Sequence, residues 1–538
     1  PARTASYADL LAGKRLERRV DRQAPLTPAT GFTVMGRHAA RVDAVARVTG
    51  KAVYSQDVSV PGMLFAKVLR PPSYGAELVS LNAAAAETWP GVVGVIHEGR
   101  LAAVLAENDE AAEMGARLVR ATWNEVPNSS GRWEIAQLLQ ETDVESVTTQ
   151  EAGSLEDGFK SAAHTLESIY LIPYISNAPM EPRAAVAAWS GDRLTVWAGS
   201  QRPFGVRDDL ARALNIDEAN IRVISPEVGG GFGGKSIYPA AIEAARLAKV
   251  AGKPVRVAYT RAEETTWATF RPAAIIQVKS GFKADGTLVA WQSHALHAAK
   301  DRAMIGRRGS ETPYAVENIE VTVAAAKGPA PAGSFRSLGG AVNHFAREVH
   351  MDEIAAAVGA DPVEYRLRQL PDARYRRVLE AAADRFGWVA GGTPSGQGQG
   401  VAIGLDVGSY AAICVGLDIQ GTEVTVKKVT AAVDCGQIVN PDGVVNQIEG
   451  SVVMGLGSAL YEAIEVEGGR VLNANWSRYR LPRMTNVPQI ESVLVDNPEI
   501  PSTGAGEPAF VPVAPACSNA VFDLTKRRIR ELPIVRQL

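Results

Sequence analysis

Short runs of hydrophobic residues recur along most of this chain, separated by polar stretches that contain glycine, proline, asparagine or other polar residues. Runs of this length between turn residues are typical of buried strands rather than of long helices. They predict strands at 51–54, 64–69, 92–96, 101–105, 193–198, 221–224, 255–259, 288–294 and 423–433.

A second set of segments has hydrophobic residues at helical spacing. Between 376 and 386 these residues fall on one face of a helix. Asp361 followed by Pro362 predicts a helix start, because aspartate caps the free N–H groups of a first turn and proline fits the first helical position. Similar patterns predict helices at 108–118, 239–250, 352–358 and 516–527. Strands and helices in this mixture predict an α+β fold class.

At 538 residues the chain is too long for one ordinary hydrophobic core, so several domains are expected. A polar connection at 128–150 and a Gly-rich linker at 391–400 separate its parts. We predict four parts: an N-terminal arm (1–35), a compact α+β domain (36–135), a larger domain of strands and helices (150–390) and a last α+β unit (391–538).

The composition excludes several classes of partner. Lys+Arg 56 against Asp+Glu 59 gives a net charge of −3, which does not indicate nucleic acid or an anionic membrane as a partner. No apolar run approaches the roughly 20 residues that span a bilayer. The three cysteines lie far apart, and neither they nor the histidines have the spacing of metal ligands, so no metal site made by protein side chains is expected.

The most informative segment is Gly229–Ser236, which reads GGGFGGKS and matches the phosphate-loop pattern GxxxxGK[ST]. An NTPase also needs an aspartate at the end of a later apolar strand to hold magnesium. Only 493–496 imitates such a strand, and no helical unit follows it. Five glycines around Phe232 instead favour backbone packed against a flat cofactor that is not a nucleoside triphosphate. A Gly-rich turn without any ligand would have the same sequence.

Two further segments carry candidate chemistry. Glu507 follows Gly504-Ala505-Gly506 and precedes a proline, so its carboxylate lies on rigid backbone with small neighbours. A partly desolvated glutamate there is a candidate general base, although a surface turn would look the same. Arg336, followed closely by two glycines, is suited to anchor an oxyanion or carbonyl, or is a solvated loop residue.

Amide and carboxylate side chains mark two weaker candidates. Asp434, Asn440 and Gln447 lie in backbone shaped by glycine and proline, which a structural turn would also explain. Gln201 directly follows a predicted strand and is a candidate donor to a ligand oxygen.

Together, and in this order, these segments resemble the large subunit of the xanthine oxidase family of molybdenum hydroxylases. The resemblance covers nearly the whole chain and is nearest to the bacterial isoquinoline/nicotinate oxidoreductase branch. Residues 47–52 and 57–64 look like its small a/b hammerhead domain, which implies that 36–135 forms this domain. The resemblance also implies two molybdopterin-binding α+β domains at 150–390 and 391–538.

By this resemblance, the cofactor is molybdenum with oxo and sulfido ligands, held by molybdopterin cytosine dinucleotide. Gln201 would bond an oxo ligand, Glu507 would take the proton from a Mo–OH nucleophile, and Arg336 would orient substrate or stabilise negative charge. The substrate would be an N-heteroaromatic compound or an aldehyde with an electron-poor carbon. The residues expected to contact the cofactor are Gly230, Gly231, Phe232, Gly233, Arg336, Gly504, Ala505 and Gly506.

Three departures from the family pattern matter. Purine-hydroxylating members have glutamate where this chain has Ser236 and phenylalanine where it has Leu338, so both positions argue against xanthine. A pterin-holding Glu-x-Gly-Gln-Gly segment normally lies between the equivalents of residues 400 and 433, where this chain has no room for it. We therefore expect that segment on another chain or upstream of Pro1.

Partners follow from the resemblance as well. Electrons leaving molybdenum need an acceptor that this chain lacks, which implies a 2Fe–2S small subunit, with an FAD or cytochrome subunit as a further candidate. A cytoplasmic and a periplasmic location both remain open. The alternatives are a P-loop NTPase and a non-catalytic scaffold of a redox complex.

Overall fold

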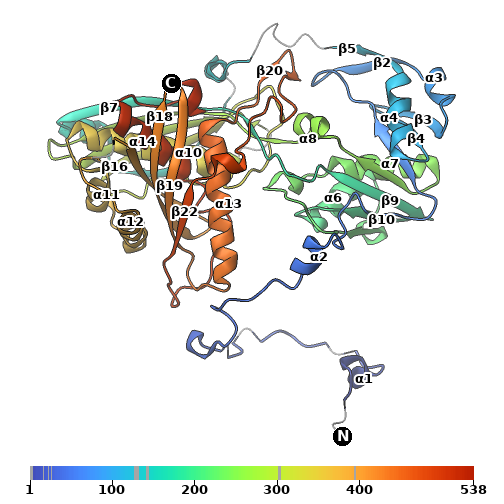
Figure 1. Ribbon diagram of the computed structural model, residues 1–538, viewed down its shortest axis with the longest axis horizontal. Coiled ribbons are helices and arrows are strands. Elements are labelled where there is room, and N and C mark those ends of the chain that lie inside the picture. Colours follow the sequence, from blue (N-terminus) through green and yellow to red (C-terminus); the bar gives the residue numbers. More distant parts are fainter. Residues whose placement is uncertain are drawn as a thin grey trace.

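The computed structural model describes residues 4–15, 17–21, 23–25, 27–125, 133–140, 144–300, 304–392 and 396–538. Its elements form two lobes, and the N-terminal arm with helix α1 (Tyr7–Leu11) extends away from both (Figure 1). The predicted connection at 128–150 lies partly outside the described residues. Within the part of the chain that is described, no helix is long and apolar enough to cross a membrane.

The first lobe is built on a seven-stranded sheet. Its strands, in spatial order, are β11 (Ile221–Ile224), β10 (Arg193–Ala198), β9 (Ala184–Ser190), β12 (Val255–Ala258), β1 (Leu64–Val68), β4 (Leu101–Ala106) and β3 (Val92–Glu98). Because β1 pairs in parallel with β12, strands far apart in the sequence share one sheet. Helix α7 (Pro239–Ala251) packs its alanines on β9 and β12, α6 (Pro203–Leu214) packs on β11, and α4 (Asp109–Leu118) packs on β1 and β4.

The second lobe contains two sheets. The five-stranded sheet has the order β6 (Ser146–Ala152), β16 (Asn318–Ala325), β15 (Leu288–His297), β14 (Ala274–Phe282), β7 (His164–Ile172). The four-stranded sheet has the order β17 (Gly398–Asp406), β18 (Ser409–Gln420), β19 (Glu423–Asp434), β22 (Gln489–Leu494). Helix α10 (Gly340–Ala357) contacts β14 and β17, one strand of each sheet, and α14 (Val513–Thr525) packs on β17 and β18.

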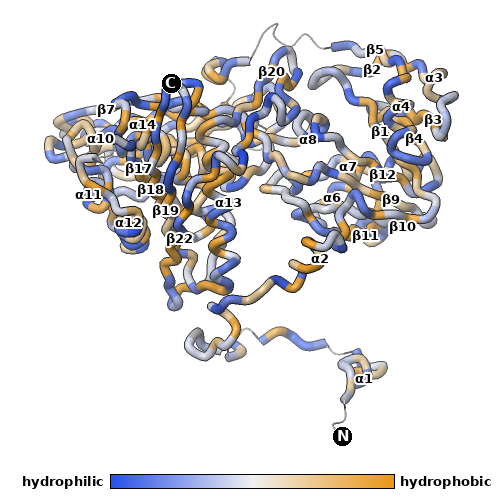
Figure 2. The backbone as a smooth tube through the Cα atoms, viewed as in Figure 1, coloured by the Kyte–Doolittle hydropathy of each residue, from blue (hydrophilic) through white to orange (hydrophobic). Residues whose placement is uncertain are grey.

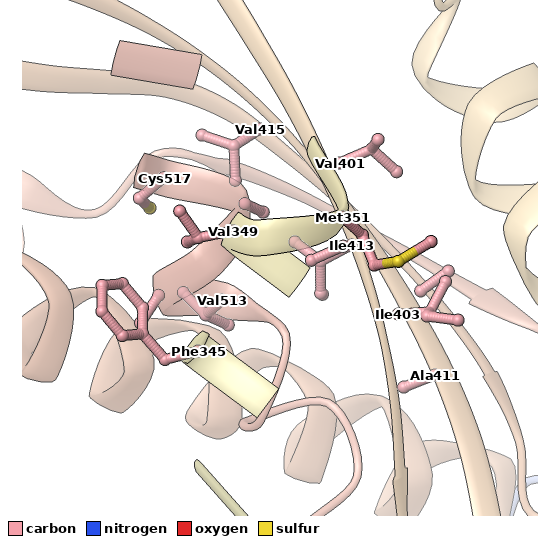
Figure 3. Close-up of a cluster of buried hydrophobic side chains, with 14 of the residues drawn as sticks. Phe345, Val349, Met351, Val401, Ile403, Ala411, Ile413, Val415, Val513 and Cys517 are labelled. Atoms are coloured by element: carbon pink, nitrogen blue, oxygen red, sulfur yellow. The ribbon is translucent and has the colours of Figure 1, made fainter. Parts of the chain in front are cut away.

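The main core fills the space around these two helices. Figure 3 shows side chains of α10, α14, β17 and β18 converging there, among them Phe345, Val401, Ile413 and Cys517. Figure 2 shows that hydrophobic stretches concentrate in the elements of the lobes and alternate with polar ones along the chain. Helices α12 (Ala373–Phe386) and α13 (Pro441–Leu460) pack against the four-stranded sheet.

Smaller elements complete the fold. The short helices are α2 (Ala44–Val48), α3 (Ala84–Glu87), α5 (Leu155–Ser161), α8 (Arg261–Trp267), α9 (Met304–Arg307) and α11 (Pro362–Gln369). The remaining strands form the pairs β2 (Glu77–Asn82) with β5 (Arg120–Asn124), β8 (Ile175–Ser176) with β13 (Phe270–Arg271), and β20 (Val466–Glu467) with β21 (Arg470–Val471). The 3-10 helices are η1 (Ala29–Gly31), η2 (Ile135–Gln140), η3 (Glu218–Asn220), η4 (Gly234–Ser236), η6 (Met484–Asn486) and η7 (Ile534–Arg536).

Most predicted elements are confirmed, and so is the α+β class. The strand predicted at 51–54 is wrong: only Tyr54 makes an isolated bridge, and its N–H donates to the Asp57 side chain in a turn. The helix predicted at 352–358 begins already at Gly340, because nearly every residue of α10 is buried and no polar face marks its first half. The division into domains and the hammerhead assignment stay predictions.

The linker predicted at 391–400 is wrong in its last residues. Gly398 and Gly400 lie in β17, a buried strand. A Cβ at either position would collide with the backbone of α14 at Ala516 and Ala520. Glycine here allows a helix to cross close to the strand rather than loosening the chain.

Candidate active site

The Gly-rich segment follows β11 and forms a tight loop, and two of its N–H groups donate to side chains. The N–H of Gly229 donates to Glu181 Oε2 at 2.8 Å, and the N–H of Gly233 donates to Gln201 Oε1 at 2.9 Å. Gly230 and Gly233 have φ of +91° and +97°, a region in which side chains are strained. Phe232 also has a positive φ and is 40 % exposed, so the loop presents an aromatic ring instead of burying it.

Lys235 is the residue that decides whether this loop is a phosphate loop. Its side chain is fully buried, and Nζ lies 2.5 Å from Glu181 Oε2. Burial lowers the pKa of Lys235, and the Glu181 carboxylate opposes that shift. A lysine held in a buried ion pair is not available to a nucleotide, so the geometry does not favour the NTPase alternative.

We predict that Lys235→Met lowers the free energy of unfolding by about 3 kcal/mol or more, because removing one partner leaves the largely buried Glu181 carboxylate without its counter-charge. Chemical denaturation of the purified protein measures this change. Lys253→Met is the matched control, since Lys253 is exposed. A nucleotide-binding lysine would give the opposite pattern, with ATP affinity lost and stability unchanged.

The second lobe meets this loop through the segment before α10. Asn177 Nδ2 donates to the carbonyl oxygens of Phe232 (2.8 Å) and Ser334 (3.0 Å), so one amide joins the two lobes. A Cβ at Gly233 would lie 2.8 Å from the carbonyl group of Ser334. The two backbones are therefore in direct contact.

Glu507 lies beside this junction, in the loop before α14. Its Oε1 accepts the N–H of Ser337 at 2.9 Å, and its Oε2 lies 2.8 Å from Nη2 of Arg308. The Glu507 side chain keeps 29 % of its surface exposed. The carboxylate is thus oriented by two donors and still open to a ligand.

Arg336 holds the backbone on which Glu507 stands. Its Nε donates to the carbonyl of Gly506 at 2.6 Å, and its Nη2 donates to the carbonyl and to Oε1 of Gln447 at 3.1 and 3.2 Å. Burial lowers the pKa of Arg336 to about 10, and the Glu507 charge opposes this shift. The guanidinium is therefore committed to protein oxygens rather than free in a loop.

Backbone strain gathers at the same place. Among the described residues, seven other than glycine have positive φ, of which two are helix C-caps, Asn215 and Lys526. Strained residues of this kind cluster at functional sites, where surrounding contacts hold them. Four of the other five, Ala178, Phe232, Ser337 and Leu338, lie in or next to the segments described above, and the fifth, Val407, lies against Gly504.

Family models settle the relationship. A model described as molybdopterin cofactor-binding domain matches residues 139–370, and a second model with the same description matches residues 334–488. Together they extend over well more than half of the chain. The chain belongs to the xanthine oxidase family of molybdenum hydroxylases.

Two curated relatives resemble this family member along nearly its whole length. A nicotinate dehydrogenase subunit of Pseudomonas putida is 31 % identical over 99 % of this chain and 49 % of its own length. The beta subunit of isoquinoline 1-oxidoreductase from Brevundimonas diminuta is 27 % identical over 94 % of this chain and 68 % of its own. The chain thus spans about half the length of the first relative and two thirds of the second.

A solved structure shares the fold. Quinoline 2-oxidoreductase from Pseudomonas putida 86 superimposes with a TM-score of 0.84 at 18 % identity, covering 93 % of this chain and 97 % of that one. At this identity the likeness shows a shared fold and carries no residue role.

The residues expected from the xanthine oxidase family fall into two touching groups. Gln201 and the loop 230–233 form the first group, and Arg336 with 504–507 forms the second. Gln447 joins the second group through Arg336.

Two expected residues stay outside the site. Asp434 is fully buried and pairs with Arg374 at 2.7 Å, and Asn440 caps α13 by accepting the N–H of Gly443 at 3.1 Å. Both therefore have structural partners, as the turn interpretation predicts.

Sequence reasoning missed Arg308 and Asp406. Asp406 is the last residue of the buried strand β17, and a charged residue at such a strand end is a weak signal. Arg308 has no signal of its own, because its partners are distant in the sequence.

Proposed function

We propose that this chain is the molybdopterin-binding subunit of a molybdenum-dependent hydroxylase that oxidises an electron-poor carbon of an N-heteroaromatic compound or an aldehyde. The observation that carries the proposal is the geometry of Glu507. Its carboxylate is fixed by the Ser337 N–H and Arg308, remains partly exposed, and stands next to a glycine loop that presents an aromatic ring.

The residues at this junction fit a molybdopterin cofactor. Small residues at 504–506 and the glycines at 230–233 allow a large ligand to approach backbone closely, with Phe232 exposed against it. Gln201 Oε1 accepts the N–H of Gly233. Its Nε2 has no partner among the described residues, so it can donate to a ligand oxygen. The described residues contain no group of three or more histidine, cysteine, aspartate or glutamate side chains that would hold a metal. This donor set suits a metal that is held by its own organic cofactor.

When bound, the cofactor, which we propose to be the cytosine dinucleotide form, supplies a two-electron acceptor and a water-derived oxygen. The chain's own residues supply position and proton transfer. The Glu507 carboxylate accepts the Ser337 N–H and a contact from Arg308, and it serves as the general base that takes up a proton on a carboxylate lone pair that these two donors leave unused. Arg336 fixes the 504–507 backbone through the Gly506 carbonyl and so determines where that oxygen points. Gln201 donates from Nε2 and orients an oxygen at the loop.

The partners are proposed from the same argument. The two curated relatives are each named as one subunit of an enzyme, which supports an assembly of several chains. We propose a 2Fe–2S protein as the electron acceptor, with FAD or cytochrome as the next carrier. We further propose that a partner chain carries the pterin-holding segment for which residues 400–433 leave no room.

Metal analysis of the complex that copurifies with this chain tests the proposal. We expect near-stoichiometric molybdenum, iron that follows a second chain on separation, and dye-linked oxidation of nicotinate, quinoline or an aldehyde. An intact complex without molybdenum would instead support the scaffold alternative and would remove Glu507 from any proton transfer.

A further inference from the structure

A salt-bridge chain of three residues connects the β17–β18 turn to Glu507. Asp406 Oδ1 pairs with Nε of Arg308, and Nη2 of Arg308 lies 2.8 Å from Oε2 of Glu507. The Asp406 side chain is 1 % exposed, whereas those of Arg308 and Glu507 are 27 % and 29 % exposed. The two salt bridges therefore connect the buried Asp406 to the partly exposed carboxylate of Glu507.

Residues of the same turn also contact the backbone that precedes Glu507. Ser409 Oγ lies 2.6 Å from Thr503 Oγ1 and donates to the Gly504 carbonyl at 2.7 Å. A Cβ at Gly504 would lie 2.6 Å from a methyl carbon of Val407. Val407 itself has φ of +47°, which is rare for a β-branched residue and persists only where the surroundings impose it.

We propose that Arg308, anchored by Asp406, is a positioning residue that fixes the carboxylate of Glu507, and that the turn 406–409 clamps the loop carrying it. This inference rests on the proposed function, since it assigns Arg308 a task only if Glu507 moves a proton. A base must lie within about 3 Å of the proton that it takes. If the Glu507 carboxylate were free to rotate, turnover would therefore fall while substrate affinity stayed the same.

The charges around Asp406 add a pH dependence to the clamp. Burial raises the pKa of Asp406 to about 6; the Arg308 charge opposes this shift and the Glu507 charge adds to it. The other groups facing this turn are the Ser337 hydroxyl and His344, whose ring accepts the N–H of Leu405 and whose pKa burial lowers well below its usual value. As the pH falls through about 6, Asp406 takes up a proton, and Arg308 loses the negative charge of its buried partner.

The decisive experiment compares variants of Arg308 in the intact complex. We expect Arg308→Gln to lower kcat by about 10- to 100-fold with KM within about twofold, because orientation and not binding is lost. Amide hydrogen exchange of the peptide covering 503–510 should become faster. Arg308→Lys should recover part of kcat, since it keeps the charge. Arg307→Gln, which removes a neighbouring charge that has no ion pair among the described residues, should match the wild type in both measurements.

Asp406→Asn tests the anchor separately. The raised pKa of Asp406 means that the folded chain binds this proton more tightly than the unfolded chain, so its contribution to stability is present at low pH and lost as the pH rises through about 6. We expect the variant to flatten this part of the melting-temperature profile and to remove an inflection near pH 6 from the kcat profile.

Each remaining outcome decides the matter. Wild-type kcat and wild-type exchange in Arg308→Gln would show that the salt bridge does not position Glu507. A fall in kcat that only parallels lost molybdenum would assign Arg308 to cofactor retention and overturn the inference. Failure of the proposed function looks different: the wild-type complex would lack molybdenum, while the exchange measurement on 503–510 would still report whether the clamp exists.

Discussion

Glu507→Gln is expected to lower turnover by about 100- to 10,000-fold while the complex keeps its molybdenum, which is the range that general base catalysis contributes. Glutamine has the shape of glutamate and retains an oxygen that accepts the Ser337 N–H, so the loop should keep its place. It cannot accept a proton at neutral pH. We therefore expect the substitution to change the rate and not the binding of the cofactor.

The measurement is the rate of reduction by substrate under anaerobic conditions, together with the molybdenum content of the same preparation. Glu499→Gln is the matched control, because Glu499 lies eight residues earlier on the same approach to α14 and is exposed. Residual turnover above about a tenth of the wild-type rate would exclude Glu507 as the base, given the size of the effect expected for this role.

Gly233→Ala is expected to disrupt the junction between the lobes and to reduce kcat/KM by about 100-fold, the penalty that a 1 Å displacement near the chemistry can impose. Two costs combine at this position. The backbone has φ of +97°, which a side chain strains, and the new Cβ would lie 2.8 Å from the Ser334 carbonyl. Relief of the clash moves Ser334, and with it the Ser337 N–H that holds Glu507.

Steady-state kinetics and molybdenum content of the Gly233→Ala complex measure this effect. Gly252→Ala separates backbone strain from the clash, because Gly252 has φ of +63° but nothing within 4 Å of an added Cβ. We expect Gly252→Ala to cost about 1 kcal/mol of stability and no activity. Equal losses in both variants would mean that strain alone matters and that the Ser334 contact does not position the site.

Local signals predicted much of the fold. The strand at 221–224 and the helix start at Pro362 are found as expected, and Asp361 accepts the N–H groups of the first turn. These features depend on residues adjacent in the chain, so hydrophobic spacing and capping chemistry suffice to locate them. The same reasoning did not find the first half of helix α10, because that helix is buried on all sides and has no polar face.

The sequence by itself determined the ingredients of the site and their order: Gln201, a glycine loop around Phe232, Arg336, and Glu507 between glycine and proline. Residue type and neighbouring glycines limit what each segment can do, so these candidates could be named before any contact was known. Their meeting was implied only by the resemblance to a family.

Only the tertiary structure shows which side chains form hydrogen bonds and ion pairs with one another. The phosphate-loop pattern cannot show that Lys235 is buried against Glu181, 54 residues away. Nor can spacing show that Arg308 bonds Glu507 across 199 residues while pairing with Asp406. Hydrogen bonds and ion pairs depend on distances of about 3 Å, and only the packing of the two lobes and the β17–β18 turn brings these atoms within that range.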